Sequence, residues 1–130
     1  MILGIIKGNS VNWYNNYYTQ QSPSGALEVK SYKDVTYQQI YSGVNLKWYV
    51  KDGNLKYDYI IAAGADYKQI QFEIKGATYI YIGNNGELII KTPLGDFAEN
   101  APVALQSGKT LRAKWILNNN TASFDIENVD

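Results

Sequence analysis

The side chains best suited to chemistry in this sequence are aromatic rings that alternate with amides near the N-terminus. The cluster comprises Trp13, Tyr14, Tyr17 and Tyr18, with Asn12, Asn15 and Asn16 beside them. Aromatic rings can stack on the apolar face of a sugar, and amides can both donate to and accept from its hydroxyl groups. The aromatic residues are therefore candidate ligand-binding residues for a carbohydrate. The structural alternative is that Trp13 and Tyr17 cover the end of the fold while the asparagines form turns.

A second group of tyrosines offers the same chemistry. Tyr49, Tyr79 and Tyr81 fall on the polar side of alternating segments, so we expect their rings to face solvent. They are also candidates for carbohydrate binding. The alternative is structural, because tyrosine is common on sheet faces, where it packs against side chains of neighbouring strands.

Few side chains in this sequence are suited to catalysis. Histidine and cysteine are absent, which removes the usual general base near neutral pH, thiol nucleophiles, disulfides and Cys or His metal sites. Paired carboxylates could serve a glycosidase, but Asp34, Asp58, Glu73 and Glu87 lie among lysines on predicted polar strand faces. Asp58 is predicted opposite Lys47, where a surface ion pair is the expected role. We therefore predict no catalytic residue, no metal ligand and no cofactor, and a protein that is not an enzyme.

Composition also argues against nucleic acid and membrane as partners. Twelve Lys and Arg balance twelve Asp and Glu, so no excess of positive charge would attract phosphates. Ser107-Gly108-Lys109-Thr110 matches only the end of a phosphate-binding loop, because Val103 stands where an earlier glycine is needed. No apolar run approaches the roughly 18 residues of a membrane-spanning helix. We predict no nucleic-acid partner and no direct membrane insertion.

One hairpin is predicted around Asp52-Gly53, a dipeptide that favours a type I′ turn. A two-residue loop there fixes the register of the flanking alternating segments. The apolar pairs predicted on one face are Val50/Leu55, Trp48/Tyr57, Leu46/Tyr59 and Val44/Ile61. Tyr49 then lies on the opposite, polar face.

A second hairpin is predicted around residues 84–86. A three-residue loop with Gly86 in the left-handed conformation would pair Ile82 with Leu88 and Ile80 with Ile90. Tyr79 and Tyr81 would then point away from these isoleucines, beside Ile89 and Lys91.

The rest of the chain keeps the period of two that is typical of strands. Strands are predicted at residues 27–32, 35–37, 70–75, 103–106, 111–117 and 123–129, with a turn at 22–25 and one helical turn at 66–70. The pattern indicates an all-β fold, an antiparallel β-sandwich or a partly open barrel of about 8–10 short strands. Residues 2–6 and 123–129 are the expected edge strands. We expect residues 1–130 to form a single domain that is a fragment of a larger multidomain protein.

The order of these elements resembles a known family. The segment at residues 37–49 reads YQQIYSGVNLKWY. It is similar to the pattern Y-x-x-[VI]-Y-P-G-[IV]-D-L-x-[YW]-Y of a β-rich domain of unknown function in bacterial surface proteins of the Bacteroidota type. The resemblance continues in order through residues 55–66, 70–77, 86–92, 101–103 and 124–126. It departs at Ser42, where the family usually has Pro, and at Asn45, where it usually has Asp, and residues 1–26 match poorly.

This resemblance implies location and partners more than chemistry. Such domains often lie near the N-terminus of surface proteins, ahead of SBBP or PKD repeats, and many of these proteins end in a gliding-motility-type sorting domain. The implied location is extracellular or at the cell surface, and the implied partners are other domains of the same chain or cell-surface proteins, with glycans also considered. We expect a non-enzymatic structural, adhesion or protein-interaction module. The alternative is a carbohydrate-binding module that uses surface Trp and Tyr residues.

Overall fold

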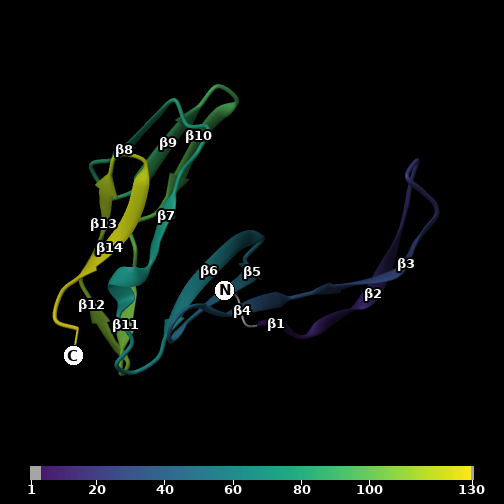
Figure 1. The fold of residues 1–130 in the computed structure, drawn as a ribbon, viewed down its shortest axis with the longest axis horizontal. Helices are drawn as coiled ribbons and strands as arrows, with labels where there is room; N and C mark the ends of the chain where they lie inside the picture. The colour runs from purple at the N-terminus through teal and green to yellow at the C-terminus, as the bar shows by residue number, and fades with distance from the viewer. Residues whose placement is uncertain (1–3, 130) are drawn as a thin grey trace. The chain divides into compact units, whose positions relative to one another are not determined.

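The computed structural model describes residues 4–129, and within them the chain is built almost wholly of antiparallel strands (Figure 1). The predicted all-β class is confirmed, because the strands form several antiparallel sheets, none of which closes into a barrel in the described range. One short 3-10 helix, η1 (Tyr67–Gln69), lies within the helical turn that the sequence predicts. The chain divides into two compact units, Met1–Tyr67 and Lys68–Asp130.

The first unit contains a four-stranded sheet and a two-stranded ribbon. The sheet has the order β1-β4-β5-β6, with β1 (Gly4–Lys7), β4 (Asp34–Tyr41), β5 (Val44–Lys51) and β6 (Asn54–Ile61). The ribbon consists of β2 (Ser10–Thr19) and β3 (Ser22–Tyr32), which pair only with each other. Both outer edges of this two-stranded ribbon are therefore without a neighbouring strand among the described residues.

The β5–β6 hairpin confirms the predicted register, including all four apolar pairs. Asp52 and Gly53 have φ angles of 51° and 75°, as a type I′ turn requires. The paired rings of Trp48 and Tyr57 have centroids 4.9 Å apart. They share a face with Val44, which is fully buried, whereas Val50 and Leu55 on the same face are 62% and 66% exposed.

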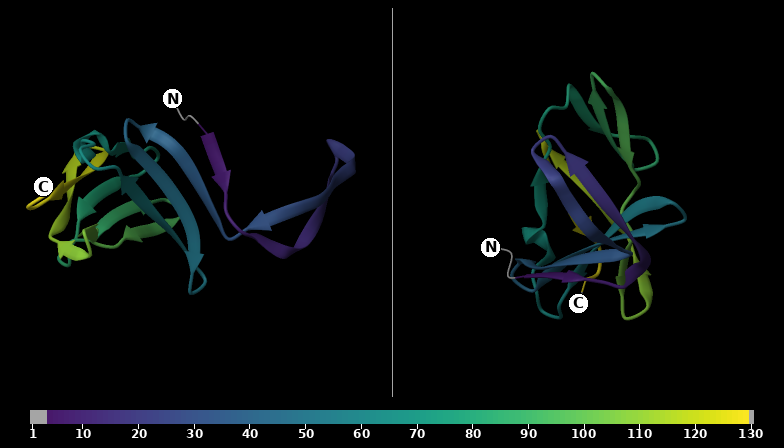
Figure 2. Two further views of the ribbon diagram at one scale, coloured as in Figure 1. Left: turned by 90° about the horizontal axis from the view of Figure 1, so that it is seen from below. Right: turned by 90° about the vertical axis from the view of Figure 1, so that its right-hand side faces the viewer.

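Hydrogen bonds join the β1–β4 ladder to the ribbon without a break. The Gly8 N–H donates to the Asp34 carbonyl and the Lys33 N–H donates to the Asn9 carbonyl, both at 2.9 Å. Residues 4–38 therefore form one long antiparallel hairpin, which can be followed from β1 and β4 into β2 and β3 in Figure 2. A Cβ at position 8 would lie too close to the Asp34 carboxylate, so a larger residue there would force the Asp34 side chain to move.

The second unit is a two-layer β-sandwich. One layer has the order β10-β9-β8, with β8 (Tyr79–Ile82), β9 (Leu88–Thr92) and β10 (Gly95–Glu99). The other has the order β13-β14-β7, with β7 (Gln71–Glu73), β13 (Ala113–Asn118) and β14 (Thr121–Ile126). A separate hairpin consists of β11 (Ala104–Gln106) and β12 (Lys109–Leu111).

Side chains from both layers form the core of this sandwich. Ile80 and Leu88 of the first layer cluster with Trp115 and Ala122 of the second, and all four are buried. The Trp115 indole N–H donates to the Asn100 carbonyl at 2.9 Å, so the buried ring leaves no unpaired donor. The predicted β8–β9 register is confirmed as well, and Gly86 has the expected positive φ, 79°.

The strands are more numerous than predicted. The described chain has fourteen strands, whereas turn spacing indicates about 8–10. Each predicted strand overlaps an observed one, but β2 and β10 are additional, and residues 111–117 divide between β12 and β13. The predicted turn at residues 22–25 lies inside β3, where Gly25 has a φ of 77° at a register shift instead of closing a loop.

One of the two edge-strand predictions is wrong. β14, which contains residues 123–126, lies between β13 and β7 and pairs with both. β1 does lie at the edge of its sheet, whereas Ile2 and Leu3 of the predicted strand are outside the described residues.

Candidate binding surfaces

The four aromatic residues predicted near the N-terminus all lie on β2 and are exposed. The exposed fractions are 64% for Trp13, 58% for Tyr14, 54% for Tyr17 and 64% for Tyr18. Consecutive residues of a strand point to opposite faces, so the ribbon divides these rings between its two faces. The idea that Trp13 and Tyr17 cover the end of the fold is wrong, because both rings remain largely accessible.

Asn16 and Gly25, which lie beside these rings, have structural roles where the pairing of β2 and β3 is irregular. The Glu28 N–H donates to Asn16 Oδ1 at 2.8 Å, where Glu28 has a φ of 54° and the register shifts. A Cβ at position 25 would lie 2.6 Å from the Tyr18 ring, so the ring packs directly over Gly25. Asn16 and Gly25 therefore shape the ribbon, and bulges of this kind increase its twist.

Tyr49 lies on the polar face of the first sheet, as predicted, but its hydroxyl is engaged. It donates to Asp58 Oδ1 at 3.2 Å. Partial desolvation, followed by the negative charge of Asp58, raises the pKa of Tyr49 above its usual value. Lys47 lies opposite Asp58 in the ladder, but the Lys47 ammonium pairs with Asp34 at 3.6 Å. The expected Lys47–Asp58 contact is thus replaced by Lys47–Asp34 and Tyr49–Asp58.

Tyr79 and Tyr81 come together on the outer face of the β10-β9-β8 sheet. Their ring centroids are 5.4 Å apart and the ring planes differ by 26°, a stacked arrangement. Tyr79 pairs with Lys91 and Tyr81 with Ile89, as the hairpin predicts. Among the aromatic residues predicted to bind a ligand, Tyr79 and Tyr81 are a pair whose rings contact each other directly.

An ion pair lies next to the stacked rings. Lys91 pairs with Asp96 across the β9–β10 ladder, and the Lys91 ammonium donates directly to Asp96 Oδ2. The hydrogen bond to Asp96 raises the pKa of Lys91, against a smaller lowering by desolvation. The hairpin pattern predicts Lys91 beside Tyr79, whereas the pairing of Lys91 with Asp96 appears only in the structure. The available signal was a two-residue turn at Pro93-Leu94, which brings residue 96 opposite residue 91.

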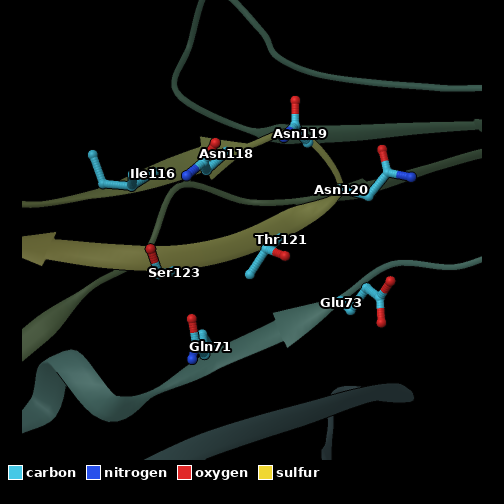
Figure 3. Close-up of a pocket in the computed structure, with 8 residues that line it drawn as sticks. All are labelled: Gln71, Glu73, Ile116, Asn118, Asn119, Asn120, Thr121 and Ser123. Carbon is cyan, nitrogen blue, oxygen red and sulfur yellow. The ribbon is translucent and has the colours of Figure 1, made fainter.

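A polar hollow of about 560 Å³ lies on the outer face of the β13-β14-β7 sheet (Figure 3). Its lining residues are Gln71, Glu73, Ile116, Asn118, Asn119, Asn120, Thr121 and Ser123. Amide, hydroxyl and carboxylate groups here can exchange hydrogen bonds with a polar ligand. Asn119 has a φ of 53°, which is typical of asparagine in a turn. The lining contains no aromatic ring, so the hollow cannot stack on a sugar.

The four carboxylates considered for catalysis have structural partners. Asp34 and Asp58 are engaged as described above, the Glu73 carboxylate pairs with Lys75 at 3.1 Å, and Glu87 accepts from the Asn85 N–H at 2.8 Å. Over residues 4–129, the structure places no three potential metal ligands together. The same range has no helix long and apolar enough to cross a membrane.

The family position occupied by Asn45 has a structural role. Asn45 Oδ1 accepts a hydrogen bond from the Gln39 N–H at 2.8 Å. Gln39 has a φ of 53°, and the β4–β5 register shifts between Tyr37 and Tyr41. Because an Asp carboxylate can accept the same bond, the change from Asp to Asn preserves this contact.

The described residues define an all-β fold with exposed aromatic side chains on its strands. Residues 3–130 match the family described as Domain of unknown function (DUF7948), and the chain belongs to this family. The predicted class of domain is thereby confirmed. No curated protein and no solved structure matches the chain significantly.

Proposed function

We propose that this chain is a non-enzymatic interaction module of an extracellular, cell-surface bacterial protein. The observation that carries the proposal is the β2–β3 ribbon, which pairs with no other strand yet carries four exposed aromatic side chains. Tyr and Trp are enriched where proteins contact each other, because they bury a large apolar area at low entropic cost. A partner that encloses both faces of the ribbon would bury all four rings.

The area available on the ribbon supports contact with a macromolecule. Fully buried, a large aromatic side chain hides roughly 150–250 Å². Four rings that are each more than half exposed, two on each face of the ribbon, supply on the order of 400 Å² to a partner that encloses both faces. This is about half of the 800 Å² that one partner contributes to a standard interface. Other domains of the same protein or neighbouring cell-surface proteins are the proposed partners. The surface location rests on the resemblance to domains of bacterial surface proteins.

Site-specific photo-crosslinking in intact cells tests this proposal. A photoreactive phenylalanine analogue would replace Tyr17 in the full-length protein, and a matched control would carry it at Leu94, a fully exposed turn residue of the other unit. We expect a discrete adduct from position 17 and none from position 94, and the adduct should be digested when protease is added outside the cells. Equal labelling at both positions, no adduct, or protection from external protease would overturn the proposal.

A second candidate function is carbohydrate binding, favoured by the stacked Tyr79 and Tyr81 rings and by the exposed Trp13 and Tyr17. A glycan array with the purified chain tests it, with Trp13→Ala and Tyr17→Ala as variants that address the ribbon. Saturable binding of a glycan that is weakened in Trp13→Ala or Tyr17→Ala supports this function. If the chain binds none of the glycans, the carbohydrate-binding function is refuted and only the proposed interaction module remains.

A further inference from the structure

The outer face of the β10-β9-β8 sheet presents its side chains in two transverse rows. One row is Tyr79–Lys91–Asp96, and the next is Tyr81–Ile89–Ala98. The opposite face of the same strands is anchored in the core through Ile80 and Leu88, both buried. The backbone beneath the rows is therefore held rigidly, which is the condition for a preorganised binding surface.

Ring stacking fixes the aromatic part of this surface. Tyr81 is partly buried and packs against Tyr79 with ring centroids 5.4 Å apart, while Tyr79 remains 64% exposed. A ring held by its neighbour has little rotamer freedom left to lose when a ligand binds. Tyr79 is thus an accessible ring that Tyr81 supports on one side.

The ion pair in the same row supplies polar groups at a defined position. The Lys91 ammonium can only donate hydrogen bonds and the Asp96 carboxylate can only accept them. Both side chains remain partly exposed, at 41% and 51%, so each keeps the capacity to bond a further group. The two charges compensate each other, so the pair is better suited to bind neutral hydroxyl groups than a charged group. One of two adjacent hydroxyls would accept a hydrogen bond from Lys91, and the other would donate one to Asp96.

We propose that Tyr79, Tyr81, Lys91 and Asp96 form a subsite for a neutral hexopyranoside. The apolar C–H face of the sugar lies on Tyr79, Tyr81 supports that ring from behind, and two adjacent hydroxyls bond Lys91 and Asp96. This inference rests on the carbohydrate-binding candidate and assigns it a place. Two other surfaces lack this combination: the ribbon divides its rings between two faces, and the polar hollow has no ring.

Titration of the ¹⁵N-labelled 130-residue chain with cellohexaose, followed by NMR, tests the subsite. We expect saturable shifts confined to β8, β9 and β10, and weaker binding of a chondroitin hexasaccharide, which is acidic. Tyr79→Thr keeps a strand-forming residue and should weaken binding about tenfold or more, whereas Tyr79→Trp should retain it. Lys91→Gln should weaken binding, and Lys114→Gln, which alters the Lys114–Asp125 pair of the other layer (3.1 Å), should not.

The outcomes separate this subsite from carbohydrate binding in general. Binding that is lost in Trp13→Ala but retained in Tyr79→Thr would overturn the subsite while leaving a carbohydrate-binding module. Stronger binding of the acidic sugar, or equal effects of Lys91→Gln and Lys114→Gln, would also overturn it. If cellohexaose and every arrayed glycan fail to bind, both the subsite and the carbohydrate-binding candidate are refuted.

Discussion

The side-chain oxygen of Asn45 accepts a hydrogen bond from the backbone N–H of Gln39, 2.8 Å away in the neighbouring strand. Gln39 in turn accepts from the Gly43 N–H through Oε1, at 3.1 Å. Two side-chain acceptors thus replace ladder bonds that are missing where the register of β4 and β5 shifts. The amide at position 45 is explained by this bulge, so it need not be assigned to catalysis.

Asn45→Leu should destabilise the chain by about 1–3 kcal/mol, the cost of leaving a part-buried donor without an acceptor. Asn45→Asp keeps an acceptor oxygen and should stay close to the parent. Urea unfolding monitored by circular dichroism measures both. An Asn45→Leu variant as stable as the parent would show that the hydrogen bond to Gln39 is dispensable.

Gly43→Ala should destabilise more than Gly53→Ala. Both glycines have positive φ angles, 73° and 75°, so both substitutions carry a similar backbone cost of about 1 kcal/mol. At Gly43, the added Cβ would also lie 2.6 Å from Ala65 Cβ, whereas nothing lies within 4 Å at Gly53. The difference between the two unfolding free energies isolates the collision, and equal losses would contradict it.

Trp115→Ala should cost about 3–5 kcal/mol, because it opens a cavity in a packed core. The ring is buried between the two layers and its N–H is bonded to Asn100. Trp13→Ala, the matched exposed tryptophan, should change stability by less than about 0.5 kcal/mol. Thermal unfolding of the two variants distinguishes these roles. A comparable loss in Trp13→Ala would mean that the ribbon ring is part of a core.

The stability of the folded chain should fall in alkaline solution because the Tyr59 hydroxyl loses its proton. Burial, followed by the charge of Tyr41, raises the pKa of Tyr59 from 10.0 to about 12. The unfolded chain releases this proton at lower pH than the folded chain, so the contribution of Tyr59 is complete below pH 10 and is lost as the pH rises towards 12. Urea unfolding at a series of pH values should show a shallower decline for Tyr59→Phe than for Tyr14→Phe. Identical declines would contradict this assignment.

Sequence reasoning succeeds here where a turn and an alternating pattern agree. Asp52-Gly53 sets the register of one hairpin and Gly86 that of another, so the faces occupied by Trp48, Tyr79 and Tyr81 follow from local rules. It fails in the ribbon, where shifts in pairing around Glu28 interrupt the period of two. Such shifts depend on contacts between distant residues, and no local pattern encodes them.

The candidate subsite was predictable in part for the same reason. The positions of Tyr79 and Tyr81 beside Lys91 follow from the hairpin, whereas the partner of Lys91 depends on a further strand after Pro93-Leu94. The position of β14 between β13 and β7 likewise depends on β7, about fifty residues earlier in the chain. Strand order over such separations is decided by the packing of whole layers, which is why the edge prediction failed.

The unbroken ladder from the ribbon into β1 and β4 has a mechanical consequence. A partner attached near the ribbon tip would pull along the strands, and the tension would pass through β4 to its long pairing with β5. Load along the strands shears many hydrogen bonds at once, whereas load across them opens the bonds one at a time. A ribbon of this geometry is suited to sustain a load directed along its strands.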